Sequence, residues 1–183
     1  VYGMTIGEYG KMINGEGWLE NKTKANLEVI RIKNYNHNLR YEPPVRPSPN
    51  LPNLQSIYLY PSLAFLEKTE VSVGRGTKIQ FQIYGHPNFI SDFSFTPMPN
   101  FGSQYPKLNG KLSFGEDLRN YKTKDKIELK WLIKSFNQIS DKTKFFRSDF
   151  DKLSGISNLK KQIIEGVSES LIRESWKDGL EKF

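Results

Sequence analysis

The sequence contains no cysteine and only two histidines, His37 and His86. Without cysteine the chain has no disulfide and no thiolate metal site, and two histidines are too few for a three-histidine zinc centre. We therefore expect no metal and no cofactor. Long apolar runs are also missing, and the mean hydropathy of −0.60 argues against a membrane span. A chain without cysteine is compatible with both reducing and oxidising compartments, so the cysteine content does not indicate where the protein is located.

The chain also begins without an initiator methionine, a basic n-region or an apolar h-region, since its first residues are Val1-Tyr2-Gly3. We therefore expect the sequence to begin inside a longer protein or after processing. Localisation cannot be read from such a start.

Basic residues outnumber acidic ones by 27 to 20, which gives a formal net charge of +7. A positive field attracts polyanions, so nucleic acid, anionic lipid and acidic glycan all qualify as partners. The lysines are interleaved with acids along the whole chain, however, which is typical of a solvated surface. A nucleic-acid-binding domain is supported by charge alone, because no nucleic-acid motif is visible.

The first 53 residues predict a helix, a strand and a loop. Thr5 and Glu8 form a capping-box pattern that starts a helix, and Gly15 is suited to end it in the left-handed conformation. A β-branched run predicts a strand within 25–33. Five prolines between residues 36 and 53 predict an ordered loop or a boundary.

The middle of the chain is predicted to be mostly β. Asn53 can cap a helix that continues to Phe65 and is bent or interrupted at Pro61. Apolar residues then alternate with polar ones over 79–83, the pattern of a half-buried strand. Two further short strands are expected at 93–95 and 111–114.

The last third of the chain is predicted to be helical. An amphipathic stripe over 127–139 follows a predicted cap at Thr123, with Leu132 and Phe136 as core anchors. Two more helices are expected over 157–166 and 168–183. We predict an α+β fold with a small, mostly antiparallel or mixed sheet, helices packed on it and C-terminal helices, in a single domain over 1–183.

The first candidate ligand-binding segment consists of Gly74, Arg75, Gly76 and Thr77. Two glycines allow positive φ and a close approach of the backbone to a ligand, while Arg75 can offer a planar pair of donors to a carboxylate. The alternative is a tight turn in which Arg75 makes a structural ion pair. The glycine spacing matches neither a dinucleotide fingerprint nor a P-loop.

A second candidate segment is the proline-rich run 47–52, which contains Ser48 and Asn50. A rigid loop can hold Asn50 toward a ligand hydroxyl at little entropic cost. Equally, Asn50 can satisfy the backbone of a proline-rich turn. Both interpretations stay open.

The sequence offers three candidate catalytic residues, Glu67, Glu70 and His86, and no motif that singles out one of them. Glycoside hydrolysis needs two carboxyl groups, and Glu67 and Glu70 lie beside the arginine-containing loop. His86 could act as a general acid or base near neutral pH, although a residue of this kind is more often a hydrogen-bonding partner in a loop. Glu8 is better explained as a cap.

The order of these motifs resembles the C-terminal half of the DUF1343 family of exo-β-N-acetylmuramidases. The resemblance extends through nearly the whole chain. It departs at Lys68 and Glu70, where the family often has Gly and Asn, and at Ser113, where it often has Cys. The matching segments are Met4-Thr5-Ile6-Gly7-Glu8, Pro47-Ser48-Pro49-Asn50-Leu51-Pro52, Tyr60-Pro61, Gly74-Arg75-Gly76-Thr77, Gly85-His86-Pro87 and Phe150-Asp151-Lys152-Leu153-Ser154-Gly155.

The resemblance implies a two-domain protein in which a Rossmann-like N-terminal domain, absent from this chain, carries the catalytic glutamate. The present part would form the other wall of the substrate cleft. The implied reaction releases N-acetylmuramic acid from the non-reducing ends of peptidoglycan fragments, in the periplasm or outside the cell. Arg75 would recognise the lactyl carboxylate, and Ser48, Asn50 and Thr77 would bind hydroxyl or amide groups. The alternative function is a non-catalytic module that binds the cell wall.

Overall fold

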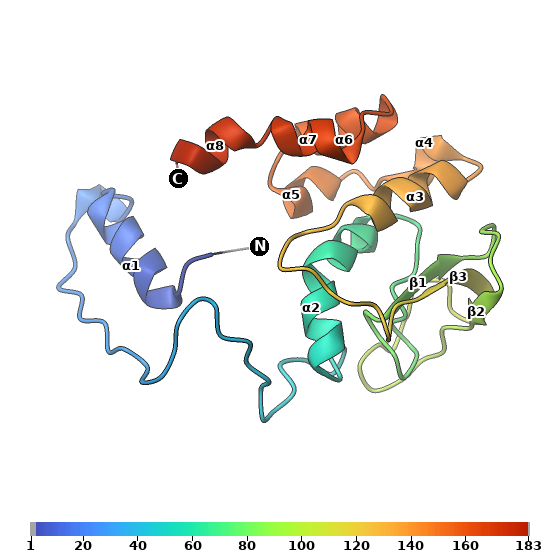
Figure 1. Cartoon of the computed structure of the whole chain (residues 1–183), viewed down its shortest axis with the longest axis horizontal. Coiled ribbons are helices and arrows are strands. Elements are labelled where there is room, and N and C mark those ends of the chain that lie inside the picture. Colours follow the sequence, from blue (N-terminus) through green and yellow to red (C-terminus); the bar gives the residue numbers. More distant parts are fainter. Residues whose placement is uncertain (1–2, 183) are drawn as a thin grey trace. The chain divides into compact units, whose positions relative to one another are not determined.

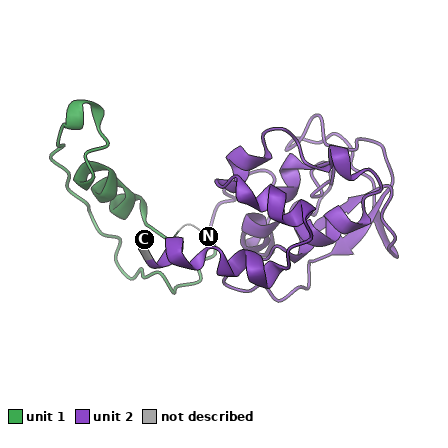
Figure 2. Cartoon of the chain, turned by 90° about the horizontal axis from the view of Figure 1, so that it is seen from above, with its two compact units in different colours: residues 1–42 green, residues 43–183 purple. Residues whose placement is uncertain are grey.

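The structure, a computed structural model, describes residues 3–182 of the chain. It divides into two compact units, residues 1–42 and residues 43–183 (Figure 2). That both belong to one domain, as expected from the sequence, stays a prediction.

The first unit begins with helix α1, Ile6–Gly15, and its capping box is confirmed. The Glu8 amide donates to Thr5 Oγ1 at 3.2 Å, and the Thr5 amide donates to Glu8 Oε2 at 2.7 Å. The predicted end at Gly15 is confirmed, but the left-handed conformation predicted for this residue is wrong. Gly15 remains helical, the helix is capped at Glu16, and the left-handed residue is Gly17 with φ +70°. A short 3-10 turn, η1, follows at Glu20–Lys22.

The strand predicted within 25–33 is not formed among the described residues. The segment is extended, but no other strand pairs with it, and β structure requires such a partner. The loop predicted over 36–53 is confirmed, since this stretch contains neither a helix nor a strand of the sheet.

The second unit begins with helix α2, Leu54–Leu63, and Asn53 is its N-cap as predicted. The Ser56 amide donates to Asn53 Oδ1 at 3.0 Å, and the Asn53 amide donates to Ser56 Oγ at 3.3 Å. Pro61 lies inside this helix. The chain then passes into the 3-10 turn η2, Ala64–Lys68, which carries Glu67.

Three antiparallel strands form the sheet: β1 Ile83–His86, β2 Phe93–Phe95 and β3 Ser113–Asp117, in the order β1-β3-β2. Gly85 and Gly115 face each other across β1 and β3. Any side chain at Gly115 would clash, because a Cβ there would lie 1.8 Å from the Tyr84 carbonyl oxygen. A small antiparallel sheet with helices confirms the α+β prediction (Figure 1).

The strand predicted over 79–83 is wrong. The chain turns here, Phe81 has φ +54°, and β1 starts only at Ile83. Gln80 and Gln82 are 6% and 3% exposed, so the polar positions of the alternating pattern do not face water. The strand predicted at 93–95 is confirmed, whereas the one predicted at 111–114 is shifted to 113–117.

The C-terminal part is helical, as predicted, but in shorter pieces. The helix predicted over 127–139 begins only after Leu129, which makes Thr123 wrong as its cap. The helix predicted over 168–183 is broken near Ser175, and its last residue, Phe183, lies outside the described residues. The helices are α3 Lys130–Gln138, α4 Lys142–Phe145, α5 Phe150–Ser154, α6 Asn158–Ile164, α7 Glu169–Glu174 and α8 Lys177–Lys182.

The core of the second unit lies between α2, the sheet and the C-terminal helices. Leu132 and Phe136 of α3 are buried, as predicted. The Phe136 ring packs against Phe145 and Phe146, with ring centroids 5.4 and 5.6 Å away. Across residues 3–182, no helix is both long enough and apolar enough to cross a membrane.

Candidate substrate groove

Three loops of the second unit surround an open groove of about 640 Å³. The proline-rich loop supplies one side, the segment after Gly76 supplies another, and the loop 97–106 between β2 and β3 supplies the third. Sequence reasoning had assigned no role to this last loop. The lining residues are Arg46, Pro49, Pro52, Thr77, Lys78, Gln80, Asn100, Phe101 and Gly102.

Asn50 joins the proline-rich loop to the loop 97–106. Its Nδ2 donates to the Gly102 carbonyl oxygen at 2.7 Å, and its backbone amide donates to Ser48 Oγ at 3.2 Å. Asn50 is only 6% exposed, and its Oδ1 accepts no hydrogen bond from the described residues. The side chain therefore links two loops that are distant in sequence, rather than the backbone of its own proline-rich turn. A role for Asn50 in ligand binding stays a prediction.

The glycine-rich segment is fixed against the same loop. Gly76 has φ +82°, and a Cβ there would lie 2.6 Å from the Met98 carbonyl oxygen, so only glycine fits. The Met98 amide donates to the Gly76 carbonyl oxygen at 2.9 Å, and Asn100 Nδ2 donates to the Thr77 carbonyl oxygen at 3.1 Å. Thr77 itself donates to the Gly74 carbonyl oxygen. Tertiary contacts thus bring the two predicted segments to one groove.

Arg75 is not among the residues that line the groove. Its Nε donates to Glu67 Oε1 at 2.5 Å and its Nη2 to Glu67 Oε2 at 2.9 Å, while the guanidinium lies 5.0 Å from the Phe81 ring centroid. The hydrogen bonds to Glu67 raise the pKa of Arg75 above its usual value. This is the ion pair that the sequence offered as the alternative to a ligand contact.

The groove itself carries positive charge without a compensating acid. Arg46 and Lys78 line it, and no aspartate or glutamate does. Neither cation has a carboxylate within 4.0 Å in the part of the chain that the structure describes. Gln80 adds a buried carbonyl oxygen, Oε1, that accepts no hydrogen bond from described residues. The two unpaired cations therefore suit a ligand with an anionic group.

The three catalytic candidates lie outside the groove lining. Glu67 is held by Arg75. His86 is 9% exposed, and its Nδ1 accepts a hydrogen bond from the Asn88 amide at 3.2 Å. Burial lowers the pKa of His86, and the nearby charge of Glu70 acts in the opposite direction. These contacts fit a hydrogen-bonding role for His86 in its loop.

Lys107 is a structurally important residue that sequence reasoning missed. Its Nζ donates to four carbonyl oxygens of the segment that carries Glu67, at 2.6 to 3.2 Å. Burial lowers the pKa of Lys107 to about 7, whereas the four carbonyl dipoles favour its charged form. Lys107 thereby ties the loop 97–106 to the turn η2. A single lysine after a proline gives no sequence signal for such a role.

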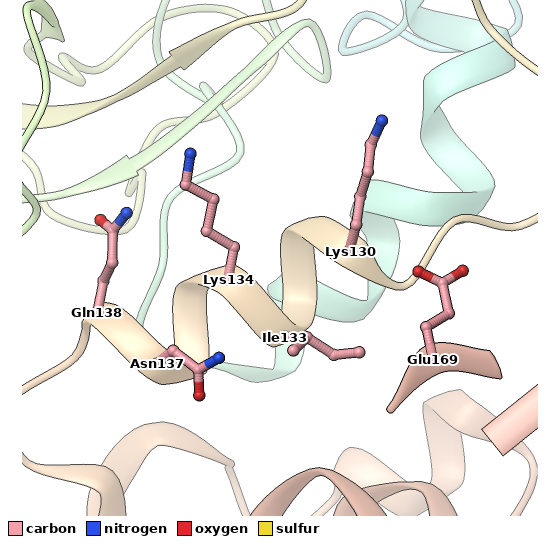
Figure 3. A pocket seen from close by; sticks show the side chains of 6 residues that line it. All are labelled: Lys130, Ile133, Lys134, Asn137, Gln138 and Glu169. Carbon is pink, nitrogen blue, oxygen red and sulfur yellow. The ribbon is translucent and has the colours of Figure 1, made fainter. Parts of the chain in front are cut away.

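A second hollow, of about 410 Å³, lies along α3 and is shown in Figure 3. Lys130, Lys134 and Gln138 project from one side of this helix, and Glu169 comes from α7. Its lysines are already neutralised, because Lys130 pairs with Glu128 at 3.2 Å and Lys134 with Glu116 at 2.5 Å. This hollow is therefore less suited to an anionic ligand. No metal-binding cluster of acids and histidines occurs within residues 3–182.

Comparison with protein families assigns both parts of the chain. Residues 58–183 match the model for the C-terminal part of the exo-β-N-acetylmuramidase NamZ, and residues 1–55 match the model for its N-terminal part. The boundary between the two matches, residues 55–58, falls in the first half of helix α2.

Individual relatives agree with this assignment. The peptidoglycan beta-N-acetylmuramidase NamZ of Bacillus subtilis is 30% identical over 206 residues, covering 100% of this chain and 48% of that protein. A DUF1343 family protein from Bacteroides fragilis has a similar crystal structure, with a TM-score of 0.95 and 41% identity over 100% of this chain and 53% of its own. A second one, at 19% identity and a TM-score of 0.70, shares the fold. The chain thus spans about half the length of its relatives.

Proposed function

Because the chain belongs to the NamZ-like DUF1343 family, we propose that it is the substrate-binding part of a peptidoglycan glycosidase. The full protein would release N-acetylmuramic acid from the non-reducing ends of glycan chains, in the periplasm or outside the cell, where peptidoglycan lies. The observation that carries the proposal is the groove, which combines two cations with no lining carboxylate.

The chemistry of the groove matches what distinguishes N-acetylmuramic acid from N-acetylglucosamine, namely a lactyl carboxylate. Arg46 and Lys78 are the first candidates to bind that group, because no acid competes for them. Phe101 is 95% exposed at the groove and offers an apolar face to a sugar ring.

Arg75 is the second candidate for carboxylate recognition. Its guanidinium already makes a two-point contact with Glu67, so a ligand carboxylate would have to share it or displace Glu67. Nη1 donates to no described residue and is the nitrogen open to such sharing. Arg46 is therefore a better candidate than Arg75 for binding the ligand carboxylate.

Catalysis would come from groups outside this chain. A glycosidase needs two carboxyl groups beside the scissile bond, and the residues that line the groove include none. Glu67 is held in an ion pair and His86 accepts a backbone hydrogen bond. We propose that the N-terminal domain of the same protein supplies the catalytic glutamate. The 183-residue chain should then show no turnover of a chromogenic muramic acid glycoside. Robust turnover by the highly purified chain would move attention to Glu67, Glu70 and His86.

Binding can be tested without activity. Titration of the chain with N-acetylmuramic acid, followed by NMR, should shift the backbone amides of Thr77, Lys78, Asn100 and Gly102. N-acetylglucosamine should bind more weakly, because it lacks the carboxylate. Shifts confined to Lys130 and Lys134, or no saturable shift with either sugar, would reject the groove as the binding site.

A non-catalytic wall-binding module is the alternative, and the absence of carboxylates from the groove lining is compatible with it. The two functions differ in the full-length protein. A glycosidase releases free N-acetylmuramic acid from peptidoglycan fragments, whereas a binding module retains the fragments unchanged.

A further inference from the structure

The ammonium group of Lys107 lies inside a cage of backbone carbonyl oxygens in the second unit. Its Nζ is 3.0 Å from the oxygen of Leu66, 3.2 Å from that of Glu67, 2.6 Å from that of Thr69 and 2.9 Å from that of Val71. All four oxygens come from the short segment 66–71, and together they are called the carbonyl cage below. In the part of the chain that the structure describes, no carboxylate lies within 4.0 Å of this nitrogen.

The carbonyl cage requires a cation at its centre. The negative ends of four carbonyl dipoles converge there, and around an apolar or empty centre they would repel one another. Carbonyl oxygens arranged in this way replace the water shell of a monovalent metal ion in potassium channels. The lysine ammonium is a compact cation with three N–H donors, one fewer than the oxygens around it. Its charge therefore contributes to holding the cage together, in addition to its hydrogen bonds.

The carbonyl cage is connected to the groove through the neighbouring residue, Pro106. The ring of Pro106 packs against Gly76, where a Cβ would lie 2.7 Å from the proline Cβ. The next residue but one along the glycine-rich segment, Lys78, lines the groove, as does its neighbour Thr77. Lys107 thus anchors the end of the loop 97–106 at the point where this loop meets the glycine-rich segment.

A second connection to the groove runs through Glu67. Its carbonyl oxygen belongs to the carbonyl cage, and its side chain holds Arg75 by two hydrogen bonds. Arg75 follows Gly74, whose carbonyl oxygen accepts a hydrogen bond from the hydroxyl of Thr77. A change in the cage is therefore transmitted to the groove from both ends of the glycine-rich segment.

We propose that Lys107 is a positioning residue for sugar binding in the groove, and that the carbonyl cage is a site for a monovalent cation, which the lysine ammonium occupies. Lys107 is not among the residues that line the groove, so it would act through Pro106 and Arg75 rather than by contacting the sugar. The positioning of a sugar rests on the function proposed above, whereas the cation site does not. A small free cation should take the place of the ammonium when the side chain is shortened.

Removal of the lysine side chain tests the carbonyl cage without any sugar. Lys107→Ala leaves the four oxygens around an open space, so the NMR signals of the Thr77 and Asn100 amides should move away from their positions in the unsubstituted chain. Ammonium chloride should return these signals in a saturable manner. Tetramethylammonium chloride at the same ionic strength should not, because this cation is larger and has no N–H donor while the general screening is equal.

Two further variants are controls for the effect of ammonium. Lys107→Met fills the space with an apolar side chain, so it should displace the groove signals and make them insensitive to ammonium. Lys111→Ala removes an exposed lysine nearby in the sequence and should leave the groove signals in place. The amides of Leu132 and Phe136 in α3 report whether the second unit stays folded in each variant.

The test is decisive even if Lys107→Ala folds only in part. Ammonium should then raise the folded fraction, because a ligand that binds only the native state stabilises it, and tetramethylammonium should have no such effect. The lack of an ammonium-specific effect on both the groove signals and the folded fraction would overturn the cation site. Groove signals that stay in place in folded Lys107→Ala would overturn the positioning role.

The affinity for N-acetylmuramic acid provides the functional measurement. Lys107→Ala should weaken binding by roughly 10-fold, the equivalent of one lost hydrogen bond, and ammonium should restore the affinity. Displaced groove signals with an unchanged affinity would reject the role of Lys107 in sugar binding. If the unsubstituted chain binds no sugar, the proposed function fails by itself, and the sugar-free measurements still decide the cation site. Work at about pH 6 keeps Lys107 charged, since burial lowers its pKa to about 7.

Discussion

Arg75 and Glu67 form a two-point ion pair, in which Nε and Nη2 of the guanidinium each donate to one carboxylate oxygen. Lys107 binds carbonyl oxygens on both sides of Glu67 and so fixes the turn that presents its carboxylate. The pair links η2 to the glycine-rich loop beside the groove. Its first role is therefore to hold the shape of that loop.

We expect Arg75→Ala to lower the free energy of unfolding by about 1 to 2 kcal/mol. Charge-assisted hydrogen bonds contribute about 1.5 to 3 kcal/mol, and partial exposure reduces this value by screening. Arg75→Lys should recover part of the loss, because an ammonium cannot make the planar two-point contact. Urea unfolding provides the measurement. Arg119→Ala, which breaks a more exposed pair with Asp117, is the matched control and should change stability much less than Arg75→Ala does. An equal effect of both variants would contradict the structural role of Arg75.

Arg46→Ala should reduce the preference of the chain for N-acetylmuramic acid over N-acetylglucosamine by roughly 10-fold, because it removes a charge-assisted contact to the carboxylate. The affinity for N-acetylglucosamine should change little. Calorimetric or NMR titration at low ionic strength measures both affinities. Lys126→Ala removes an exposed charge that does not line the groove, and it controls for general electrostatics.

Arg75→Ala provides the contrast to Arg46→Ala. If Arg75 is the carboxylate clamp, folded Arg75→Ala loses the preference for N-acetylmuramic acid and Arg46→Ala keeps it. That result would transfer the recognition role from Arg46 to Arg75. Loss of stability with an unchanged preference assigns Arg75 to the ion pair alone.

Phe136→Ala should lower the free energy of unfolding by about 3 to 5 kcal/mol, since it removes a buried ring from an aromatic cluster and leaves a cavity. Asn137→Ala changes the neighbouring exposed residue of α3 and should have an effect below about 0.5 kcal/mol. Denaturant unfolding compares the two. A loss below about 1 kcal/mol for Phe136→Ala would contradict the position of this ring in the core.

His86 should make the protein less stable as the pH falls from about 7 to about 5. Burial holds the pKa of His86 in the folded state below its usual value of 6.5, so the unfolded chain binds more protons in this range. Protonation would also remove the acceptor for the Asn88 amide. Stability is thus fully present above the unfolded pKa and falls as the pH drops toward the folded pKa.

The measurement is the free energy of unfolding across this range for the natural sequence and for His86→Asn. The asparagine keeps an acceptor but does not titrate, so its stability should depend less on pH between about 7 and 5. Identical slopes for the two proteins would show that His86 is not the responsible group.

The sequence by itself determined the features that depend on neighbouring residues. The capping boxes at Thr5 and Asn53 each join residues three positions apart, so a local pattern was sufficient to locate both helix starts. The buried stripe of α3, with Leu132 and Phe136, follows from helical periodicity in the same way. The order of motifs along the chain also identified the family.

Only the tertiary structure decided which distant groups meet. Asn50 and Gly102 are 52 residues apart, and Lys107 binds carbonyl oxygens 36 to 41 residues away. Alternation over 79–83 predicted a strand, yet burial of Gln80 on an enclosed turn removed the contrast between inner and outer faces. The run 25–33 has strand character but no neighbour here, because a strand depends on hydrogen bonds from another segment. The preferences of individual residues favour a local conformation. Strand pairing and side-chain burial also need a second segment of the chain, and only the tertiary structure brings that segment into contact.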